Sequence, residues 1–252
     1  MKKILFTARD LNLGGIEKAL VMLTNYLSEE GYDITVVLEK KEGILLDELD
    51  SKIKVYEYRP AENKIKLFQK IENMCKRIKA ILKYKDKYDV GVSFATYSIP
   101  GSFIARIASK KSILWGHADY FSLFDEDEDK MKRFFESVHY NKFSKVVFVA
   151  ESAKRTFLNV FPEMEKVTYH CNNLIDSEKI KSMASENIDL KKDEKVTTFL
   201  NVGRHDEKQK KLTRIIEASK MLKDDGYSFK VIFVGNGEST DFYKELSKKE
   251  RS

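Results

Sequence analysis

The sequence of 252 residues is poor in cysteine and proline and has no long apolar run. Its two cysteines, Cys75 and Cys171, have neither metal-ligand spacing nor the number that a disulfide framework needs, which agrees with a reducing compartment. No apolar run approaches the ~18 residues of a membrane span, and Arg9 and Asp10 follow the start too closely for a signal-peptide core. We therefore expect a cytoplasmic chain. Hydrophobic residues make up 42% of it, which excludes a disordered or fibrous polymer.

Outside one segment, the sequence has no excess of positive charge. Between Glu62 and Lys87, nine bases stand against three acids, and this excess of six equals the formal charge of +6 on the whole chain. The rest of the sequence is formally neutral, so the basic character belongs to one part of the surface.

Hydrophobic periodicity predicts short strands that alternate with amphipathic helices. We expect strands at Lys3–Thr7, Asp33–Leu38, Lys54–Tyr58, Tyr88–Phe94, Ser112–Trp115, Lys145–Val149 and Lys166–Tyr169. Helices are expected between them, at Ile16–Glu30, Lys64–Leu82, Ile99–Ser109, Asp129–Asn141 and Ser152–Val160. Strands joined through helices form a parallel sheet whose ligands bind beyond the carboxyl ends of the strands, so the pattern predicts a Rossmann-like α/β domain.

The pattern restarts after a polar segment. Strands are expected at Val196–Val202 and Phe229–Val234, with a helix near Leu212–Lys223 and a helical stretch at Asp241–Ser252. We expect an N-terminal domain at residues 1–172, an interdomain segment at 173–195 and a partial second Rossmann-like domain at 196–252. Two strands in about 60 residues make a marginal domain, so we expect a truncated sheet that a partner chain or a second copy covers.

A glycine pair, Gly14 and Gly15, stands between the first predicted strand and its helix. Glycine lets the backbone approach a ligand, and the free N–H groups of a helix N-terminus favour a phosphate. A plain turn explains the pair equally well. The spacing differs from G-x-G-x-x-G, so a nicotinamide site loses its main support.

A second turn, Asn201–His205, places Arg204 at a strand end, ahead of Lys208, Lys210 and Lys211. An arginine that forks onto oxygens and a lysine that adds a point charge make a clamp for a diphosphate, whereas a solvated basic loop is the alternative. The third turn, with Gly235, Gly237 and Glu238, repeats the arrangement of strand, glycine and helix.

In order and spacing, a series of motifs resembles the successive signatures of family 4 glycosyltransferases: Gly14-Gly15-Ile16-Glu17, Ile113–His117, Asn173–Asp176, Val202–Arg204 with Gln209–Leu212 and Ile215–Ala218, and Val234–Glu238. The resemblance implies a GT-B architecture of two Rossmann-like domains facing across a cleft. It also implies a sugar nucleotide held mainly by the C-terminal domain and a glycan or lipid-linked acceptor held mainly by the N-terminal one.

Roles follow from the resemblance residue by residue. Gly14 and Gly15 would bind the donor phosphate, His117 would contact the transferred sugar, and Arg204 and Lys210 would neutralise the leaving diphosphate. Fixed cations at the leaving oxygen lower the barrier without a metal, so no metal and no cofactor are expected. The loop with Gly235, Gly237 and Glu238 would lie on the nucleotide side. Asp119 follows His117 and is a weaker candidate for orienting an acceptor hydroxyl.

The family retains anomeric configuration, and the resemblance names no protein nucleophile. It implies transfer in bacterial surface polysaccharide assembly. Two features depart from the family: Lys211 replaces the usual glycine beside the lysine, and the chain stops before a glutamate pair that would hold sugar and ribose. The alternative function is a non-catalytic or half-enzyme subunit that binds acceptor, docks on a membrane and needs a partner chain.

Two other features compete for a function. The acidic run Asp125–Asp129 contains D-x-D triplets that suit a divalent metal, although a solvated turn and helix start is favoured. In the basic segment 64–87, an apolar stripe runs among the lysines. Either the stripe packs on the core, or it docks on the anionic inner face of a membrane. Nucleic acid is disfavoured because nothing aromatic is interleaved on the polar face and no binding motif appears.

Overall fold

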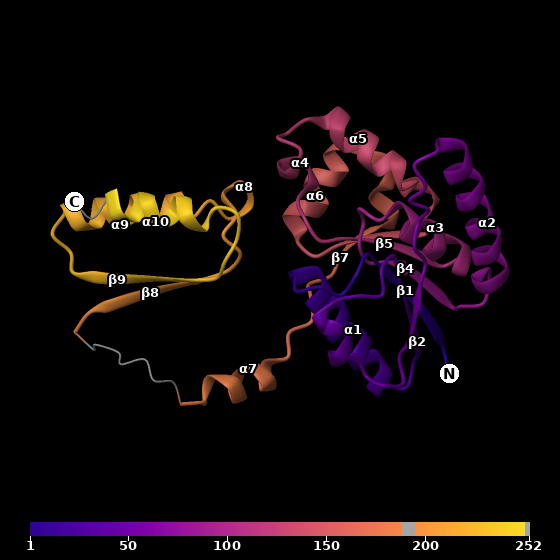
Figure 1. Ribbon diagram of the computed structural model, residues 1–252, viewed down its shortest axis with the longest axis horizontal. Coiled ribbons are helices and arrows are strands. Elements are labelled where there is room, and N and C mark those ends of the chain that lie inside the picture. The colour runs from indigo at the N-terminus through magenta and orange to yellow at the C-terminus, as the bar shows by residue number, and fades with distance from the viewer. Residues whose placement is uncertain (188–194, 250–252) are drawn as a thin grey trace. The chain divides into compact units, whose positions relative to one another are not determined.

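The structure is a computed structural model that describes residues 1–187 and 195–249 (Figure 1). The chain divides between Ser182 and Met183 into two compact units, called unit 1 and unit 2 below. This division lies inside the predicted interdomain segment. Part of that segment, 188–194, and the last three residues of the predicted C-terminal helical stretch, 250–252, lie outside the described residues.

Unit 1 is built on a seven-stranded parallel sheet, as the sequence predicts. Its strands are β1 (Lys3–Ala8), β2 (Asp33–Leu38), β3 (Lys54–Glu57), β4 (Val90–Ser93), β5 (Ser112–Gly116), β6 (Lys145–Phe148) and β7 (Thr168–His170). They lie in the order β3-β2-β1-β4-β5-β6-β7. The order reverses between β1 and β4, and in open α/β sheets the crevice beyond the carboxyl ends of such a strand pair is the usual ligand site.

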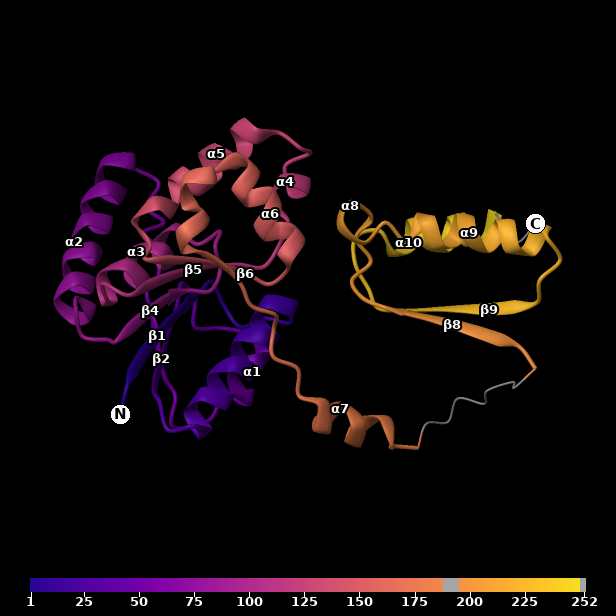
Figure 2. The same cartoon turned by 180° about the vertical axis from the view of Figure 1, so that it is seen from behind.

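Helices cover both faces of this sheet. They are α1 (Gly15–Glu29), α2 (Lys66–Tyr84), α3 (Ile99–Ala108), α4 (Tyr120–Leu123), α5 (Glu128–Ser137) and α6 (Glu151–Val160), with 3-10 turns at Ile44–Glu48, Tyr140–Lys142 and Pro162–Val167. The buried side chains of α1 pack with Phe6 and Val36 on one face, whereas Leu5 and Val37 pack with α2 and α3 on the other. Figures 1 and 2 show α1 and α3 on opposite sides of the strands.

The structure corrects two sequence-based boundaries and adds a helix that was not predicted. The helix predicted to reach Asn141 ends at Ser137, because His139 adopts a left-handed conformation with φ 55° and starts a new turn. The strand predicted from Lys166 begins at Thr168, since residues 162–167 form a 3-10 turn. The polar interdomain segment contains a helix, α7 (Ser177–Ala184), whose side chains are all exposed.

Unit 2 has two parallel strands, β8 (Thr197–Val202) and β9 (Phe229–Val234), with helices α8 (Glu207–Lys210), α9 (Thr213–Asp224) and α10 (Thr240–Lys249). Figure 1 shows α9 and α10 on the same side of the two strands. Their small core contains Leu212, Ile216 and Tyr243. On the strands, the apolar side chains of Leu200 and Val202 stay exposed, so the described residues cover the sheet incompletely.

Candidate functional site

Gly14 is the N-cap of α1, and Gly15 is the first residue of the helix, directly beyond the loop that follows β1. Without a Cβ, the glycine pair leaves the backbone N–H groups at the helix start open to a ligand. The site is not purely electropositive, however. The Glu17 carboxylate lies over Gly14, where an added Cβ would be 2.1 Å from Glu17 Oε2, whereas nothing lies within 4 Å of a Cβ at Gly15. A phosphate at Gly15 would have this carboxylate as a neighbour.

Tyr97 follows β4, the strand beside β1 at the point where the strand order reverses. Its hydroxyl donates to Glu17 Oε1 over 3.4 Å. Burial, followed by the charges of Glu17 and Asp10, raises the pKa of Tyr97 above its usual range, so the phenol stays a neutral hydrogen-bond donor. Tyr97 and Glu17 thus join the segment that follows β4 to the first turn of α1.

Ser98 anchors the start of α3 at the same edge. Its buried hydroxyl accepts a hydrogen bond from the Gly101 N–H at 2.8 Å and donates to Glu39, which follows β2. The first bond caps α3, and the second joins the segments that follow β4 and β2.

His117 follows β5 and lies against aromatic rings. Its ring centroid is 4.3 Å from that of Phe94, and it stacks on Trp115 at 6.4 Å. Both ring nitrogens are buried and have no hydrogen-bond partner among the described residues. Burial lowers the pKa of His117 to about 4, against a smaller opposing effect of the Phe94 backbone. At neutral pH this imidazole is uncharged and keeps one donor and one acceptor unused, which suits the hydroxyl groups of a sugar.

Asp119 is the N-cap of α4, and its carboxylate is engaged within unit 1. It accepts from the Phe121 N–H, the Ser122 hydroxyl and the Thr156 hydroxyl, at 3.0 to 3.1 Å. These bonds stabilise the α4 N-terminus and join it to α6. The predicted acceptor role of Asp119 therefore competes with a complete structural role.

In unit 2, Arg204 and Lys210 are exposed; Arg204 follows the carboxyl end of β8, and Lys210 is the last residue of the short helix α8 that comes next. Arg204 Nη2 donates to Gln209 Oε1 over 3.1 Å, whereas the Lys210 ammonium has no hydrogen bond or ion pair with the described residues. The α8 N-terminus between them is capped by Asp206, which accepts from the Lys208 and Gln209 N–H groups. Arg204 and Lys210 thus present two accessible cations close together in the chain.

Lys211 ends α8 with φ 48° and ψ 49°, which is the left-handed conformation. Glycine adopts this conformation without the steric cost that a Cβ brings. A glycine at this position would therefore avoid a steric cost that Lys211 carries.

Gly235 and Gly237 have a structural function in the loop after β9. An added Cβ at Gly235 would lie 1.8 Å from the Gly203 carbonyl oxygen, and one at Gly237 would lie 2.3 Å from the His205 carbonyl oxygen. The two loops are also joined by hydrogen bonds from the Gly203 N–H to Val234 and from the His205 N–H to Asn236, both 3.0 Å long. The glycines therefore allow the turn with Arg204 to pack on the next turn; the exposed Glu238 follows them.

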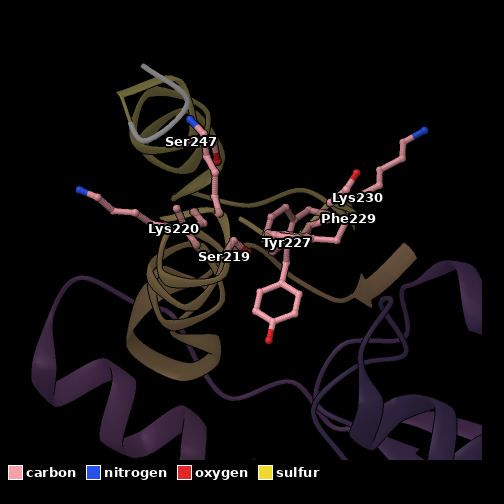
Figure 3. Close-up of a pocket in the computed structure, with 11 residues that line it drawn as sticks. Ser219, Lys220, Tyr227, Phe229, Lys230 and Ser247 are labelled. Atoms are coloured by element: carbon pink, nitrogen blue, oxygen red, sulfur yellow. The ribbon is translucent and has the colours of Figure 1, made fainter. Parts of the chain in front are cut away.

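Two hollows lie in unit 2. One of about 530 Å³ lies between α9, α10 and the first half of β9, with Tyr227 and Phe229 in its wall (Figure 3). It lies at the end of the sheet opposite to the turn with Arg204. A second, of about 350 Å³, includes Gly235 and the buried His205, whose Nδ1 is 3.0 Å from the Thr240 hydroxyl. Only this second hollow reaches a residue predicted for the nucleotide side.

The acidic run forms a turn, in which Asp125 and Glu126 have φ 56° and 62°, and Asp127 then caps α5. Across residues 1–187 and 195–249, no three His, Cys, Asp or Glu side chains are grouped so that they could hold a metal ion. The acidic run therefore forms a turn and the start of a helix, which is the interpretation that the sequence favoured.

The sequence interpretation missed Tyr97 and treated Glu17 only as part of a motif. Tyr97 had a usable signal, because it follows a predicted strand that lies next to the first strand in a doubly wound sheet. The position of Glu17 over Gly14 had none, since it depends on a side-chain rotamer.

Comparison with known proteins was informative only at the level of structure. Neither a family model nor a curated protein sequence matches the chain. Among solved structures, a variant of S. aureus TarM in complex with Fondaparinux, alpha-GlcNAc-glycerol and UDP matches with a TM-score of 0.67 and 12% identity, over 100% of this chain and 76% of that one. Anabaena HepE in complex with UDP-glucose matches with a TM-score of 0.66 and 15% identity, over 99% of this chain and 65% of that one.

The lipopolysaccharide outer core galactosyltransferase WaaB matches with a TM-score of 0.62 and 13% identity, over 100% of this chain and 65% of that one. These neighbours are GT-B glycosyltransferases, and at such identities the likeness shows the fold. The chain has a GT-B-like α/β fold, as predicted, and spans about two thirds of the length of HepE and WaaB.

Proposed function

We propose that this chain belongs to a glycosyltransferase that moves a sugar from a nucleotide diphosphate donor to a glycan or lipid-linked acceptor. The observation that carries the proposal is the pair of accessible cations after β8, with Arg204 at the carboxyl end of the strand and Lys210 at the end of α8. Ligands of parallel α/β sheets bind at such strand ends, and two cations match the charge of a diphosphate. The GT-B-like fold agrees with this chemistry.

In the proposed reaction, the bond between the anomeric carbon and the diphosphate oxygen breaks, and its electron pair stays on the leaving diphosphate. An acceptor oxygen forms the new bond to the anomeric carbon, and its proton passes to the leaving diphosphate oxygen. Arg204 and Lys210 would stabilise the charge that grows on the leaving oxygen, which is the role of a metal in other transferases, and we propose a reaction without metal. Retention of configuration and membership of family 4 are part of the proposal.

In unit 1, His117 is proposed to bind the transferred sugar through its two unpartnered ring nitrogens. The Gly15 N–H is proposed to bind a donor phosphate, with the Glu17 carboxylate nearby. Tyr97 holds Glu17 by its hydroxyl and is a candidate for the acceptor side, where Asp119 also remains proposed. Transfer in surface polysaccharide assembly is supported by the function that the name of WaaB states, and a cytoplasmic location is proposed with it.

The test is calorimetric titration of the chain with UDP, which is bound in the TarM structure and forms part of the UDP-glucose bound in the HepE structure. We expect Arg204→Ala to weaken binding by about 10-fold to 100-fold, because a charge-assisted pair contributes about 1.5–3 kcal/mol. Arg214→Ala is the matched control: it removes the same charge from an exposed position on α9.

Equal affinities for wild type, Arg204→Ala and Arg214→Ala would remove Arg204 from the site. Equal weakening in both variants would mean that the loss of affinity comes from the lower net charge and not from a contact of Arg204 with the diphosphate. Titration with other nucleoside diphosphates extends the same comparison to the donor base.

The second candidate is a subunit that binds donor or acceptor and completes its site with another chain. The exposed apolar side chains of β8, with Leu200 63% and Val202 69% exposed, favour it. A transferase assay of the chain alone separates the two: turnover supports the enzyme, whereas UDP binding without turnover favours the subunit.

A further inference from the structure

Helix α2 has its apolar face turned to solvent. Six apolar side chains recur at helical spacing along it and are between 37% and 73% exposed: Leu67, Ile71, Met74, Ile78, Ile81 and Leu82. Residues three and four positions apart lie on one face of a helix, so these six form one stripe, called the α2 stripe. The stripe expected from the sequence has Ile65, Phe68 and Cys75 in place of Leu67, and these three side chains are exposed as well. The interpretation in which the stripe of segment 64–87 packs on the core is therefore wrong.

The opposite face of α2 holds the helix to unit 1. Ala80 and Tyr84 are buried with Leu5 and Ile104. In the N-terminal half of the helix, the attachment is polar. Gln69 Nε2 donates to the Ala61 carbonyl, and Asn73 Oδ1 accepts from the Ala61 N–H, both over 2.9 Å. Because these contacts fix the rotation of the helix, the solvent exposure of the α2 stripe is a consequence of packing.

Lysines flank the α2 stripe on both sides. Lys66 and Lys70 lie on one side of it and Lys79 on the other, as the 100° step of the helix dictates. All three are exposed and have no hydrogen bond or ion pair with the described residues. Other bases are partly used: Lys83 lies over the Tyr56 ring at 3.6 Å and Lys76 pairs with Glu72 at 2.7 Å.

We infer that α2 docks unit 1 on an anionic lipid surface, lying in the interface with the α2 stripe inserted and the flanking lysines at the headgroups. An exposed apolar stripe bordered by lysines on an otherwise polar helix is the composition of interfacial helices. Within the described residues, no helix is long and apolar enough to cross a bilayer, so α2 lies along the surface.

Charge favours a lipid surface over two other occupants of the α2 stripe, a second copy of the chain and a neutral apolar partner. A second copy docked on the same face would bring two segments with an excess of six positive charges each against one another. A neutral apolar partner would leave the flanking ammonium groups without counter-charge. An anionic bilayer satisfies both the apolar stripe and the cations, and its use is independent of the proposed sugar transfer.

The experiment is flotation of the full chain with vesicles of equal parts phosphatidylglycerol and phosphatidylcholine, and with vesicles of phosphatidylcholine alone. We expect binding to the anionic vesicles and much weaker binding to the neutral ones. Replacing Lys66, Lys70 and Lys79 by Gln should weaken anionic binding on the order of 100-fold, since each base near such a surface contributes about five-fold. Replacing Leu67, Ile71 and Ile78 by Gln should weaken it by at least roughly 10-fold.

The control replaces Lys2, Lys142 and Lys166 by Gln, which removes the same charge from exposed positions of unit 1 outside α2. Anionic binding that survives the control but is lost in both α2 variants supports the inference. Equal binding to both kinds of vesicle, or an equal effect of control and α2 variants, overturns it. A concentration-dependent dimer abolished by the apolar variant, without vesicle binding, overturns it in favour of a second copy. UDP affinity, measured on the same variants, reports separately on the proposed function.

Discussion

Gly235→Ala should destabilise unit 2 more than any other single methyl group added to its glycines. Gly235 has φ +149°, and an added Cβ would lie 1.8 Å from the Gly203 carbonyl oxygen. A side chain in such a conformation costs about 1–3 kcal/mol. Moving the loops apart would also weaken the hydrogen bonds from Gly203 to Val234 and from His205 to Asn236, at about 1 kcal/mol each. The sum is about 3–5 kcal/mol.

Hydrogen exchange followed by mass spectrometry measures this loss, because peptides from β8 and β9 report the opening of unit 2 while those from β1 and β4 serve as an internal reference. Gly203→Ala is the matched control, since nothing lies within 4 Å of its added Cβ. Gly237→Ala should fall between the two, because its Cβ would overlap a carbonyl oxygen at 2.3 Å but its φ is not positive. Exchange in Gly235→Ala no faster than in Gly203→Ala would refute the loop-packing argument.

Two further predictions concern single positions. Lys211→Gly should stabilise unit 2 by about 1 kcal/mol, because glycine adopts the left-handed conformation at φ 48° without steric cost. Slower hydrogen exchange in α8 and α9 would show the gain, whereas the control Lys208→Gly, inside α8, should destabilise unit 2. His117 takes up a proton near pH 6.5 in the unfolded state, whereas its pKa in the folded state is about 4. Between these values the unfolded state binds more protons, so the free energy of unfolding decreases as the pH is lowered, by up to about 3 kcal/mol. Urea unfolding of His117→Gln should lack this part of the decline; an identical pH profile would mean that the ring is hydrated in the native state.

The hydrophobic periodicity predicted the seven strands of unit 1 and both strands of unit 2, because each strand is short, apolar and bounded by turns. The turns after these strands contain His117 and Arg204, which directly follow β5 and β8, whereas Lys210 lies at the end of α8; their roles stay predictions. Element ends were harder to predict: the left-handed His139 stops a helix whose sequence continues the pattern.

By itself, the sequence determined the alternation of strands and helices, the residues that follow each strand and the concentration of net charge in one segment, because these depend on the order of residues alone. Only the tertiary structure decided the orientation of α2: its apolar stripe would suit a core, yet Gln69, Asn73, Ala80 and Tyr84 make the contacts that turn the stripe outward. The same holds for the Glu17 carboxylate over Gly14 and for the contact of Gly235 with Gly203, which depend on side chains and loops distant in sequence. Local pattern specifies elements, whereas packing between them specifies what each face is free to bind.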